Sequence, residues 1–596
     1  MVLQDHSVGT FQTGDYVVFA CLFVVSSGIG VFFAVKERKK ASSREFLVGG
    51  RQMTCGPVAL SLTASFMSAV TVIGAPSDVY RFGASYVIFG IAYTFVVILT
   101  AELFLPVFYR SGITSTYEYL ELRFCKPVRI AATLIYMVQT ILYTGVVVYA
   151  PALALNQVTK FNLWGSIIAT GVVCTFYCTL GGLKAVVWSD AFQMVVMVVG
   201  FLTVLVQGSN SSGGIAAVWK TAQDGERLDI FKALYLNLLG LWLILFCAVV
   251  SGLIMYAFYA GCDPWTAGYV TAPDQLMPYF VLDILGRYPG LPGLFVACAF
   301  SGTLSTVAAS INALATVTYE DFVRQCCGDI SNRAATWISK ALCVVFGVAC
   351  TSMAVTASYM GAIVQAALSI HGMCGGPMLG VFSLGILFPF TNSKGAIGGL
   401  LLGITLAFWA AVGAFIYPAS PNYTNPLSLS TENCTLLNST AAAAAAAAVT
   451  QTPLLISTTA SSDRSVLAES WYSMSYLYYS TVGFLATVIG GLLITVLTVP
   501  SKPQDVKPGL IRPVCDLFCF CSEKYRRLCW CGVNHAEEKM DLADLDFGTA
   551  WEIHPDQDKI IKTGRNGKKQ SYDLQDEAYN NIAFVPDTTG QVMSGN

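Results

Sequence analysis

Residues 175–193 read TFYCTLGGLKAVVWSDAFQ, in which two apolar segments are joined through a pair of glycines. Gly181–Gly182 breaks the first segment as a helix, and Lys184 marks the cytosolic edge. Asp190 lies just inside the second segment, and Gln193 follows one helical turn later. A carboxylate in an apolar span is costly unless it is paired or faces water, so Asp190 predicts an ion pathway. A helix-end acid that reaches the membrane surface is the alternative interpretation.

Similar apolar segments occur along most of the chain. Of its 596 residues, 55% are hydrophobic and 12% charged, whereas about a quarter are charged in soluble domains. We therefore predict an all-α polytopic membrane protein. Twelve stretches are long enough to cross a bilayer as helices: 16–35, 53–79, 84–108, 128–155, 162–181, 186–207, 233–258, 290–318, 335–358, 361–389, 394–417 and 470–499. Segment 273–287 is shorter, carries two aspartates and is predicted to be interfacial.

The chain is predicted to divide into three parts. They are an extracellular N-terminus at 1–15, a transmembrane transporter domain at 16–499 and a cytosolic tail at 500–596. Within the second part, loop 418–469 is rich in Ser, Thr and Pro and contains a poly-alanine run, so we expect an extracellular linker. The tail is polar, charged and rich in Gly and Asn, which is typical of disorder.

The loops on the two sides of residues 208–232 disagree by one membrane crossing. Before this point, basic loops after the first, third and fifth spans place the N-terminus and the sequon at Asn210 outside. After it, counting spans places the sequons inside and the basic tail outside. These sequons are at Asn422, Asn433 and Asn438. One more span after Asn210 would repair the topology, but NSSGGIAAVWKTAQDGERLDIF is too polar to supply it. We therefore predict that one helix is missing.

Two further apolar runs carry many small hydroxyl residues: GPVALSLTASFMSAVTVIG at 56–74 and ACAFSGTLSTVAASINALATVTYEDF at 297–322. Such residues let a helix unwind and offer carbonyl and hydroxyl oxygens to a hard cation such as sodium. In the second run, Ser305 and Thr306 are adjacent and follow Gly302. Packing of small residues and hydrogen bonding of Ser or Thr to their own helix remain alternative explanations.

With FFAVKERKKASSREFLVGGRQM (32–53), TSTYEYLELRF (114–124), QTILYTGVVVYAPALALNQVT (139–159) and IRPVCDLFCFCSEKYRRLCWCGV (511–533), these runs resemble the sodium/solute symporter family, solute carrier family 5. The resemblance covers about residues 10–500 and is closest to the sodium-coupled monocarboxylate branch, in particular its low-affinity, electroneutral type. It implies a leucine-transporter-like bundle of two inverted five-helix repeats. About 12 transmembrane helices are expected here, against 13 in the family.

The resemblance also implies which residues bind. Sodium would be held by carbonyl or side-chain oxygens of Ala64, Met67, Gly302, Ser305 and Thr306, with Asp190 and Gln193 on the inner exit side. Substrate would lie against Ser68, Thr71, Gln139 and Tyr143. The missing element would be the first helix of the second repeat, which normally forms one wall of the substrate cavity. One span with its flanks amounts to about 40–50 residues.

The implied function is sodium-coupled symport of small monocarboxylates such as lactate, pyruvate, nicotinate and short-chain fatty acids, at the plasma membrane and apically in epithelia. Expected partners are this substrate, sodium as the coupling ion and the lipid bilayer, without nucleic acid or another cofactor. Two alternatives remain: a transport-defective variant lacking one core helix, and a symporter of another small anion such as iodide, or of a vitamin. The spans contain no HExxH, GxSxG or clustered-His pattern, so we do not expect an enzyme.

Other cysteines and one histidine carry weaker signals. The cluster Cys515–Cys531 lies beside Arg526 and is predicted to be palmitoylated, with a zinc site as the alternative. An outer disulfide involving Cys262 or Cys434 remains open. His371 is interpreted as a packed residue rather than a proton relay.

Overall fold

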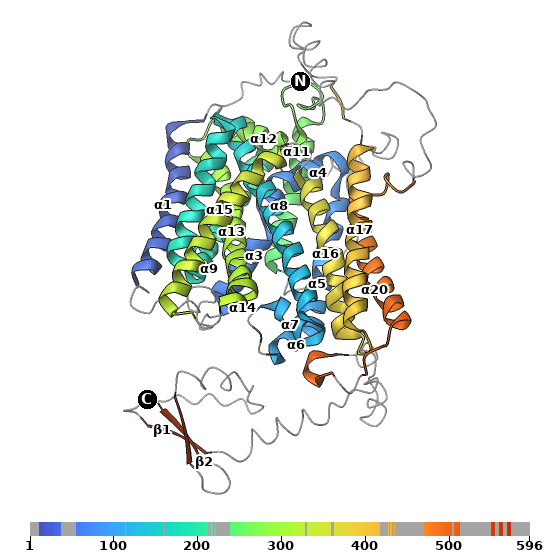
Figure 1. Ribbon diagram of the computed structural model, residues 1–596. Coiled ribbons are helices and arrows are strands. Elements are labelled where there is room, and N and C mark those ends of the chain that lie inside the picture. Colours follow the sequence, from blue (N-terminus) through green and yellow to red (C-terminus); the bar gives the residue numbers. More distant parts are fainter. Residues whose placement is uncertain are drawn as a thin grey trace.

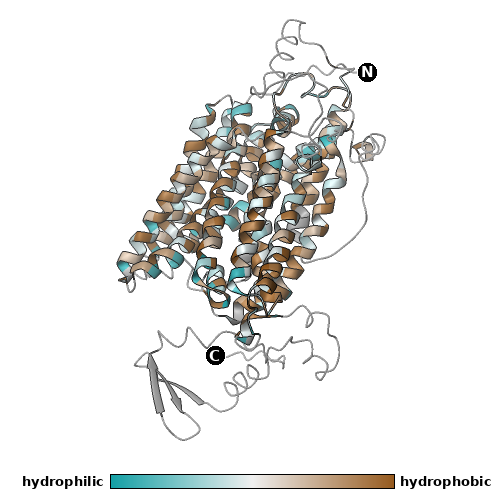
Figure 2. Ribbon diagram, turned by 45° about the vertical axis from the view of Figure 1, so that its right-hand side comes forward, coloured by the Kyte–Doolittle hydropathy of each residue, from teal (hydrophilic) through white to brown (hydrophobic). Residues whose placement is uncertain are grey.

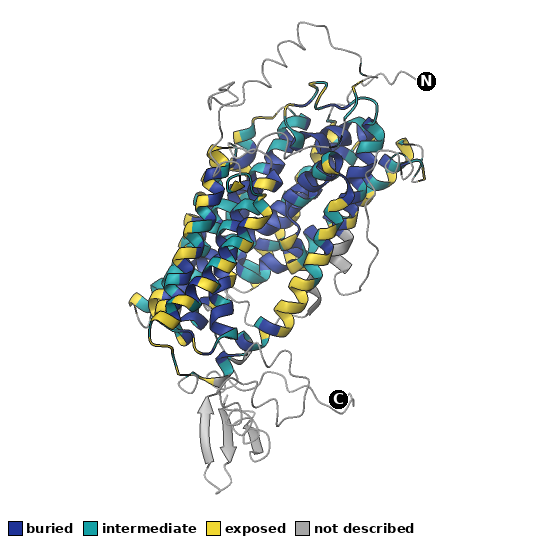
Figure 3. Cartoon of the chain, turned by 90° about the vertical axis from the view of Figure 1, so that its right-hand side faces the viewer, coloured by how far each residue is buried: buried dark blue, intermediate teal, exposed yellow. Residues whose placement is uncertain are grey.

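The computed structural model describes residues 11–36, 55–111, 113, 115–159, 161–212, 214, 216–218, 221, 239–327, 330–358, 363–417, 427, 429–431, 434, 470–502, 506–512, 550–554, 559–563 and 569–573. The helices form one bundle and lie roughly side by side (Figure 1). Apolar residues cover most of its helices (Figure 2). Buried residues fill its interior (Figure 3). The sequons at Asn422, Asn433 and Asn438 and the cluster Cys515–Cys531 lie outside the described residues.

The first half of the bundle is built from helical elements whose bounds lie within the described residues. They are α1 (Thr13–Lys36), α3 (Cys55–Phe66), the π-helix η2 (Val70–Gly74), α4 (Ala75–Phe82), η3 (Ala84–Val87), α5 (Ile88–Leu99), η4 (Thr100–Phe104), α6 (Leu105–Arg110), α7 (Thr116–Arg123), α8 (Lys126–Thr159) and α9 (Leu163–Ser211). Gly182, with φ 58° and ψ −161°, breaks α9, so this 49-residue helix supplies two crossings.

The second half follows after residue 238. It contains α11 (Leu239–Tyr259), η6 (Pro273–Gln275), α12 (Leu276–Leu285), α13 (Leu291–Thr318), η7 (Tyr319–Val323), α14 (Arg324–Cys327), α15 (Asn332–Ala357), α16 (Ile363–Leu387), α17 (Ser393–Ile416), η9 (Tyr476–Tyr478), α20 (Tyr479–Leu497) and η11 (Pro508–Leu510). In the tail, β1 (Ala550–His554), β2 (Lys559–Thr563) and β3 (Lys569–Asp573) pair as an antiparallel meander.

The predicted crossings are found in the described part of the chain. Nine helices there are long and apolar enough to cross a bilayer, or ten with the bent pair Leu60–Phe66 and Val70–Phe82. Counting both halves of α9 and adding α11 gives the twelve predicted spans. Segment 273–287, predicted to be interfacial, is instead buried: most of α12 is covered by neighbouring helices at the end of the bundle where α4 also ends (Figure 1).

Contacts between distant segments define the outer face of the bundle. Asp15 Oδ1, just after the N-terminus, accepts hydrogen bonds from the N–H groups of Gly290 (2.7 Å) and Gly293 (3.1 Å). Gln207 Nε2, beside the exposed Asn210, donates to the Tyr288 hydroxyl at 3.3 Å. The end of α9 therefore lies on the same face as the N-terminus.

A disulfide between Cys262 and Cys434 resolves the open question about the outer cysteines. It joins the loop after α11 to the segment that carries the second set of sequons, and disulfides form on the oxidising side of a membrane. Tyr80 at the end of α4 donates to Asp263 Oδ1 at 2.7 Å, which places the end of α4 on this face as well. Cys434 and the end of α9 therefore lie at one face.

These positions locate the topological conflict. Helices α9 and α11 both end at the outer face, so α11 must begin at the inner face. The 27 residues from 212 to 238 join the two ends, and those from 222 to 238 lie outside the described part. This connection contains Asp224, Glu226, Arg227, Asp229 and Lys232, so its sequence is not that of a membrane span.

A reciprocal contact between α9 and α15 reveals the internal repeat. A Cβ atom on Gly171 would collide with Thr351, and a Cβ atom on Gly347 would collide with Thr175. In each helix, the threonine follows the glycine by four residues and donates to its carbonyl oxygen at 2.7 Å. Equivalent residues that contact each other in both directions are related by a local two-fold axis. The fourth helices of the two predicted repeats, α9 and α15, meet in this way.

Candidate sodium and substrate site

The broken helix α3–η2 forms the centre of the candidate site. Its two parts, Leu60–Phe66 and Val70–Phe82, are bent by 58°. At the break, Ser68 Oγ accepts a hydrogen bond from the Val70 N–H at 3.2 Å. This hydrogen bond competes with the backbone hydrogen bonds that would continue the helix. A helix that ends at Phe66 leaves its last carbonyl oxygens without partners in that helix. Oxygen atoms of this kind suit a hard cation.

Helix α13 packs directly against this break. A Cβ atom on Gly302 would lie 3.0 Å from the Met67 carbonyl oxygen, so only glycine leaves room for this approach. Thr306 Oγ1 donates to the carbonyl oxygens of Ser65 (3.2 Å) and Gly302 (2.9 Å). Of the residues expected to bind sodium, Met67, Gly302 and Thr306 thus lie together, and the fully buried Ala64 is one helical turn before the break.

Asp190 and Ser305 extend this oxygen-lined region. Asp190 is buried, and its Oδ2 accepts a hydrogen bond from Ser61 Oγ at 2.6 Å. Ser305, on the facing helix α13, is fully buried as well. Asp190 Oδ1 and Ser305 Oγ are both buried without a hydrogen-bond partner among the described residues. Each such atom costs about 1–3 kcal/mol, which a bound cation would offset.

Gln193 lies one turn beyond Asp190 and is fully buried. Its Nε2 donates to Ser26 Oγ and Ser189 Oγ, both at 3.1 Å. Its Oε1, like the two atoms above, has no partner in the described part of the chain. The sequence marks Ser61 as one of the hydroxyl residues of the run 56–74, but not Ser26, and it gives the partner of neither because both partners are more than 120 positions away.

The residues expected to contact substrate form a connected polar row. The Tyr143 hydroxyl donates to Ser68 Oγ at 3.3 Å. The Tyr143 ring lies 4.3 Å from the ring of His371, and Gln139 Nε2 lies 2.8 Å from His371 Nδ1. Thr71, in η2, is half-buried nearby in sequence. Substrate would thus meet hydroxyl, amide and imidazole groups beside the break.

The interpretation of His371 as a packed residue is only partly met. The side chain has partners in Gln139 and Tyr143, but it is exposed rather than buried. An exposed side chain at this depth in a helix bundle lines an opening. The sequence clue to this exposure was the position of His371 beside the glycine-rich GMCGGP, because glycines let other groups approach a helix closely.

Helix α5 and the following η4 carry a bare stretch. Eight successive residues from Phe95 to Glu102 are exposed, including Phe95 (61%) and Leu99 (53%). Because an α-helix makes one turn every 3.6 residues, this run covers more than two turns, so no side of these turns is buried. Tyr93, two residues before this run, is packed: it lies against the buried cluster that includes Val79, Leu245 and Val249.

The outer end of the site is closed by the segment before α12. Asp274 Oδ2 accepts a hydrogen bond from the Ile363 N–H, at the start of α16, at 3.0 Å. Burial raises the pKa of Asp274 to about 6, while this hydrogen bond and the positive charge of Arg81 act in the opposite direction. The Arg81 guanidinium lies 4.9 Å from the ring of Trp265. These contacts tie α4, α16 and the loop after α11 together.

Comparisons with known proteins agree with this architecture. The model of the sodium:solute symporter family matches residues 46–232 and 229–403. The chain belongs to the sodium:solute symporter family. A Danio rerio protein named sodium-coupled monocarboxylate transporter 2 is 66% identical over 99% of both chains. Its Homo sapiens namesake is 60% identical, covering 97% of this chain and 99% of the relative. The Homo sapiens sodium/iodide cotransporter is 41% identical, covering 84% and 86%.

A solved structure supports the fold. The substrate-bound, outward-open state of a Na⁺-coupled sialic acid symporter aligns with a TM-score of 0.63 at 18% identity, covering 83% of this chain and 100% of that one. Together with the reciprocal contact between α9 and α15, this confirms the expected leucine-transporter-like bundle. The chain is accordingly a multi-pass membrane protein of a symporter family.

The comparisons also bear on the prediction of a missing helix. The two family matches meet at residues 229–232, within the connection between α9 and α11. The alignment with the Danio rerio relative has 635 positions, 39 more than the 596 residues of this chain. At least 39 aligned positions therefore have no residue here, close to the 40–50 expected for one span with its flanks. Charges and sequons predicted the same place.

Proposed function

We propose that this chain carries the site of a sodium-coupled symporter of small monocarboxylates, such as lactate, pyruvate, nicotinate and short-chain fatty acids. The observation that supports this most directly is the break in α3. There, Gly302 closely approaches the Met67 carbonyl oxygen, and Thr306 reaches the Ser65 carbonyl oxygen. The proposed sodium ligands are Ala64, Met67, Gly302, Ser305 and Thr306. Asp190 and Gln193 would receive the ion on its way to the inner face.

The proposed substrate region lies beside the sodium ligands. Ser68, Thr71, Gln139 and Tyr143 offer hydroxyl and amide donors, as a carboxylate requires. Sodium in the adjacent break would neutralise the charge of the anion, so neither ion would enter this apolar region alone. The relatives named sodium-coupled monocarboxylate transporter 2 favour this substrate class over iodide or a vitamin.

Radiolabelled nicotinate tests the substrate class. We expect uptake in sodium and not in choline by a chain into which the missing segment of the Danio rerio relative has been inserted. Lactate and butyrate should compete for this uptake. Competition by iodide, with no effect of lactate, would instead assign the site to another anion.

A second candidate function is favoured by the bare turns of α5 and by the missing positions in the alignment. We propose that the chain as it stands binds sodium but is transport-defective, because one wall of the substrate cavity is absent. Surface biotinylation separates two forms of this candidate. If the chain reaches the cell surface but takes up no substrate, sodium binding is not coupled to transport. If the chain stays in the endoplasmic reticulum, its maturation fails.

Modification and location complete the proposal. We expect the protein at the plasma membrane, apically in epithelia, with glycans at Asn210, Asn422, Asn433 and Asn438 and palmitate on Cys515–Cys531. Asn→Gln substitution should show glycans at both groups of sequons, because the end of α9 with Asn210 and the Cys262–Cys434 disulfide lie at the same face of the bundle. Strictly sequential insertion of twelve spans would instead leave one group unmodified.

A further inference from the structure

One tyrosine of α9 contacts the backbone of α13 beside the proposed sodium ligands. Tyr177 is fully buried, and its hydroxyl donates a hydrogen bond to the carbonyl oxygen of Leu304 at 2.7 Å. Leu304 directly precedes Ser305, so this hydrogen bond ends one residue away from a proposed ligand. Because it is made to the backbone, the hydrogen bond holds α13 itself rather than one of its side chains.

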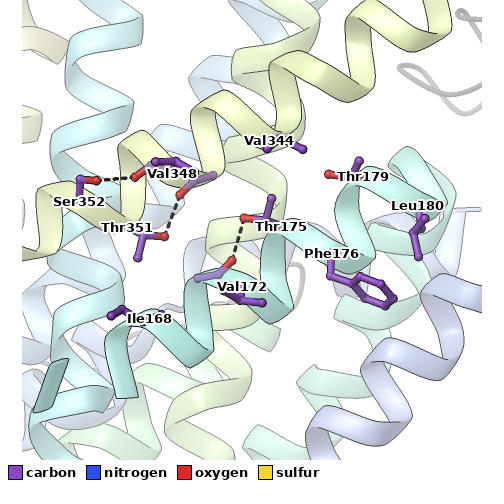
Figure 4. A pocket seen from close by; sticks show the side chains of 12 residues that line it. Ile168, Val172, Thr175, Phe176, Thr179, Leu180, Val344, Val348, Thr351 and Ser352 are labelled. Atoms are coloured by element: carbon purple, nitrogen blue, oxygen red, sulfur yellow. Dashed lines mark hydrogen bonds between the residues drawn. The ribbon is translucent and has the colours of Figure 1, made fainter. Parts of the chain in front are cut away.

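Tyr177 lies on the side of α9 that faces the interior of the bundle. The nearby Phe176 and Leu180 are on another side, where they line an apolar groove between α9 and α15 (Figure 4). Phe176 is 49% exposed, whereas Tyr177, about 100° further round the helix, belongs to the same buried cluster as Leu304. The hydrogen bond between Tyr177 and Leu304 therefore forms away from water, where a hydrogen bond is electrostatically stronger.

A glycine of α1 makes room for the Tyr177 side chain. A Cβ atom on Gly30 would lie 2.7 Å from the Cβ atom of Tyr177 and 3.2 Å from its Cα atom, so only glycine allows α1 and α9 to meet at this distance. Gly30 is itself buried. Helix α1 precedes the first helix of the two predicted repeats. It therefore supports the sodium side of the site from outside these repeats, through Tyr177.

Two other contacts hold the same stretch of α13. Thr303 Oγ1 donates to the carbonyl oxygen of Val147 in α8 at 3.2 Å, and Cys178 Sγ donates to that of Ala308 at 3.6 Å. A thiol is a weak donor, and 3.2 Å is long for a hydroxyl hydrogen bond. The hydrogen bond from the tyrosine is thus the strongest of the three that fix residues 303–308.

A site of this kind works only if its ligand atoms stay within about 0.5 Å of the required positions, and groups behind the ligands provide this precision. We propose that Tyr177 is a positioning residue of the sodium site. Its hydroxyl fixes the rotation of α13 about its axis, and so sets how far the oxygens of Ser305 and Thr306 lie from the break in α3. Tyr177 does not bind the ion. This inference rests on the proposed sodium site and adds a residue that acts through α13.

Tyr177→Phe tests this role in the present chain, because it removes the hydroxyl and keeps the ring. The apparent affinity for sodium should fall about tenfold, the lower end of the effect of residues that orient metal ligands. The measurement is the sodium concentration that gives half of the maximal rise in melting temperature, with choline as the reference.

Tyr119→Phe is the matched control. Tyr119 is also fully buried, and its hydroxyl also donates to a backbone carbonyl oxygen, that of Leu510 at 2.9 Å, but it belongs to a different buried cluster. Without sodium, both variants should lower the melting temperature by similar amounts. Only Tyr177→Phe should change the sodium concentration for half-maximal stabilisation.

The outcomes separate this inference from the proposed sodium site. If Ser305→Ala weakens the response to sodium and Tyr177→Phe leaves it at the wild-type value, the positioning role is wrong and the site stands. An equal loss of sodium affinity in Tyr119→Phe would also overturn the positioning role, because any lost buried hydroxyl would then loosen the site. If sodium does not stabilise the unsubstituted chain, the proposed site fails, and the role of Tyr177 fails with it.

Discussion

Helices α13 and α5 are both apolar, yet they are packed very differently. In the most apolar stretch of the α13 span 83% of residues are buried, against 11% in the span that contains α5. Helix α13 contributes Gly302, Ser305 and Thr306 to the proposed sodium ligands and packs against the break in α3. The turns Phe95–Glu102 of α5 and η4 are instead exposed on every side.

The contrast shows that the two halves of the site depend on different parts of the chain. The sodium side is assembled from α3, α9 and α13, which approach through Gly302 and through Gly200, where a Cβ atom would lie 2.5 Å from the side chain of Cys298. None of these contacts involves the missing helix. On the substrate side, Gln139, Tyr143 and His371 contact one another, and we propose that the absent helix would cover them. Loss of one helix can therefore spare ion binding and impair substrate binding.

Alanine substitution of one phenylalanine in each helix should show the largest effect of this difference in packing. Phe300 of α13 is 1% exposed and Phe95 of α5 is 61% exposed. Phe300→Ala should lower the free energy of unfolding by about 3 kcal/mol, the lower end of the usual range, because lipid is as apolar as the protein interior and mainly the cavity cost remains. Phe95→Ala should change it by less than about 0.5 kcal/mol. Reversible unfolding in mixed micelles gives both values.

Insertion of the missing segment provides the control for this pair. In the restored chain, Phe95→Ala should become costly, while the effect of Phe300→Ala should stay the same. If Phe95→Ala were already as destabilising as Phe300→Ala in the present chain, α5 would be packed and the comparison would fail.

Ser305→Ala should weaken sodium binding in this chain without any restored helix. Removing one oxygen ligand is expected to lower the apparent affinity about tenfold, or roughly 1.4 kcal/mol. The measurement is the rise in melting temperature with sodium, with choline as the reference. Ser310→Ala, five residues later on α13 and facing elsewhere, should leave the response unchanged. A full response to sodium in the Ser305→Ala variant would remove this residue from the ion site.

His371→Ala should have the smallest effect, and only on substrate. In the restored chain, loss of the contacts with Gln139 and Tyr143 should raise the concentration for half-maximal nicotinate uptake about fivefold, equivalent to one hydrogen bond. The concentration of sodium for half-maximal uptake should not change. An equal shift for both ions would show that His371 supports the whole bundle rather than the substrate side.

Much of this architecture is accessible from the sequence, for physical reasons. Membrane spans can be recognised from their length and hydropathy, so all twelve could be placed from the sequence. The missing helix was visible because loop charges and sequons obey one topology before Asn210 and another after it. Both rules act on single segments, and neither needs knowledge of how the helices pack.

Contacts between distant segments could not be derived in the same way. The pairing of Cys262 with Cys434, the hydrogen bond from Ser61 to Asp190 and the exposure of His371 all depend on which helices are neighbours. The exposure of α5 is the clearest case, since Phe95–Glu102 reads as an ordinary apolar helix. Only the absence of a neighbour makes it unusual.

The most direct test compares lactate uptake by this chain with uptake by the same chain carrying the inserted segment of the Danio rerio relative. Both should be measured in sodium and in choline and normalised to protein at the cell surface. We expect sodium-dependent lactate uptake to be at least tenfold higher in the restored chain. Sodium should raise the melting temperature of both chains. Equal uptake by the two chains would contradict the claim that the substrate side is incomplete.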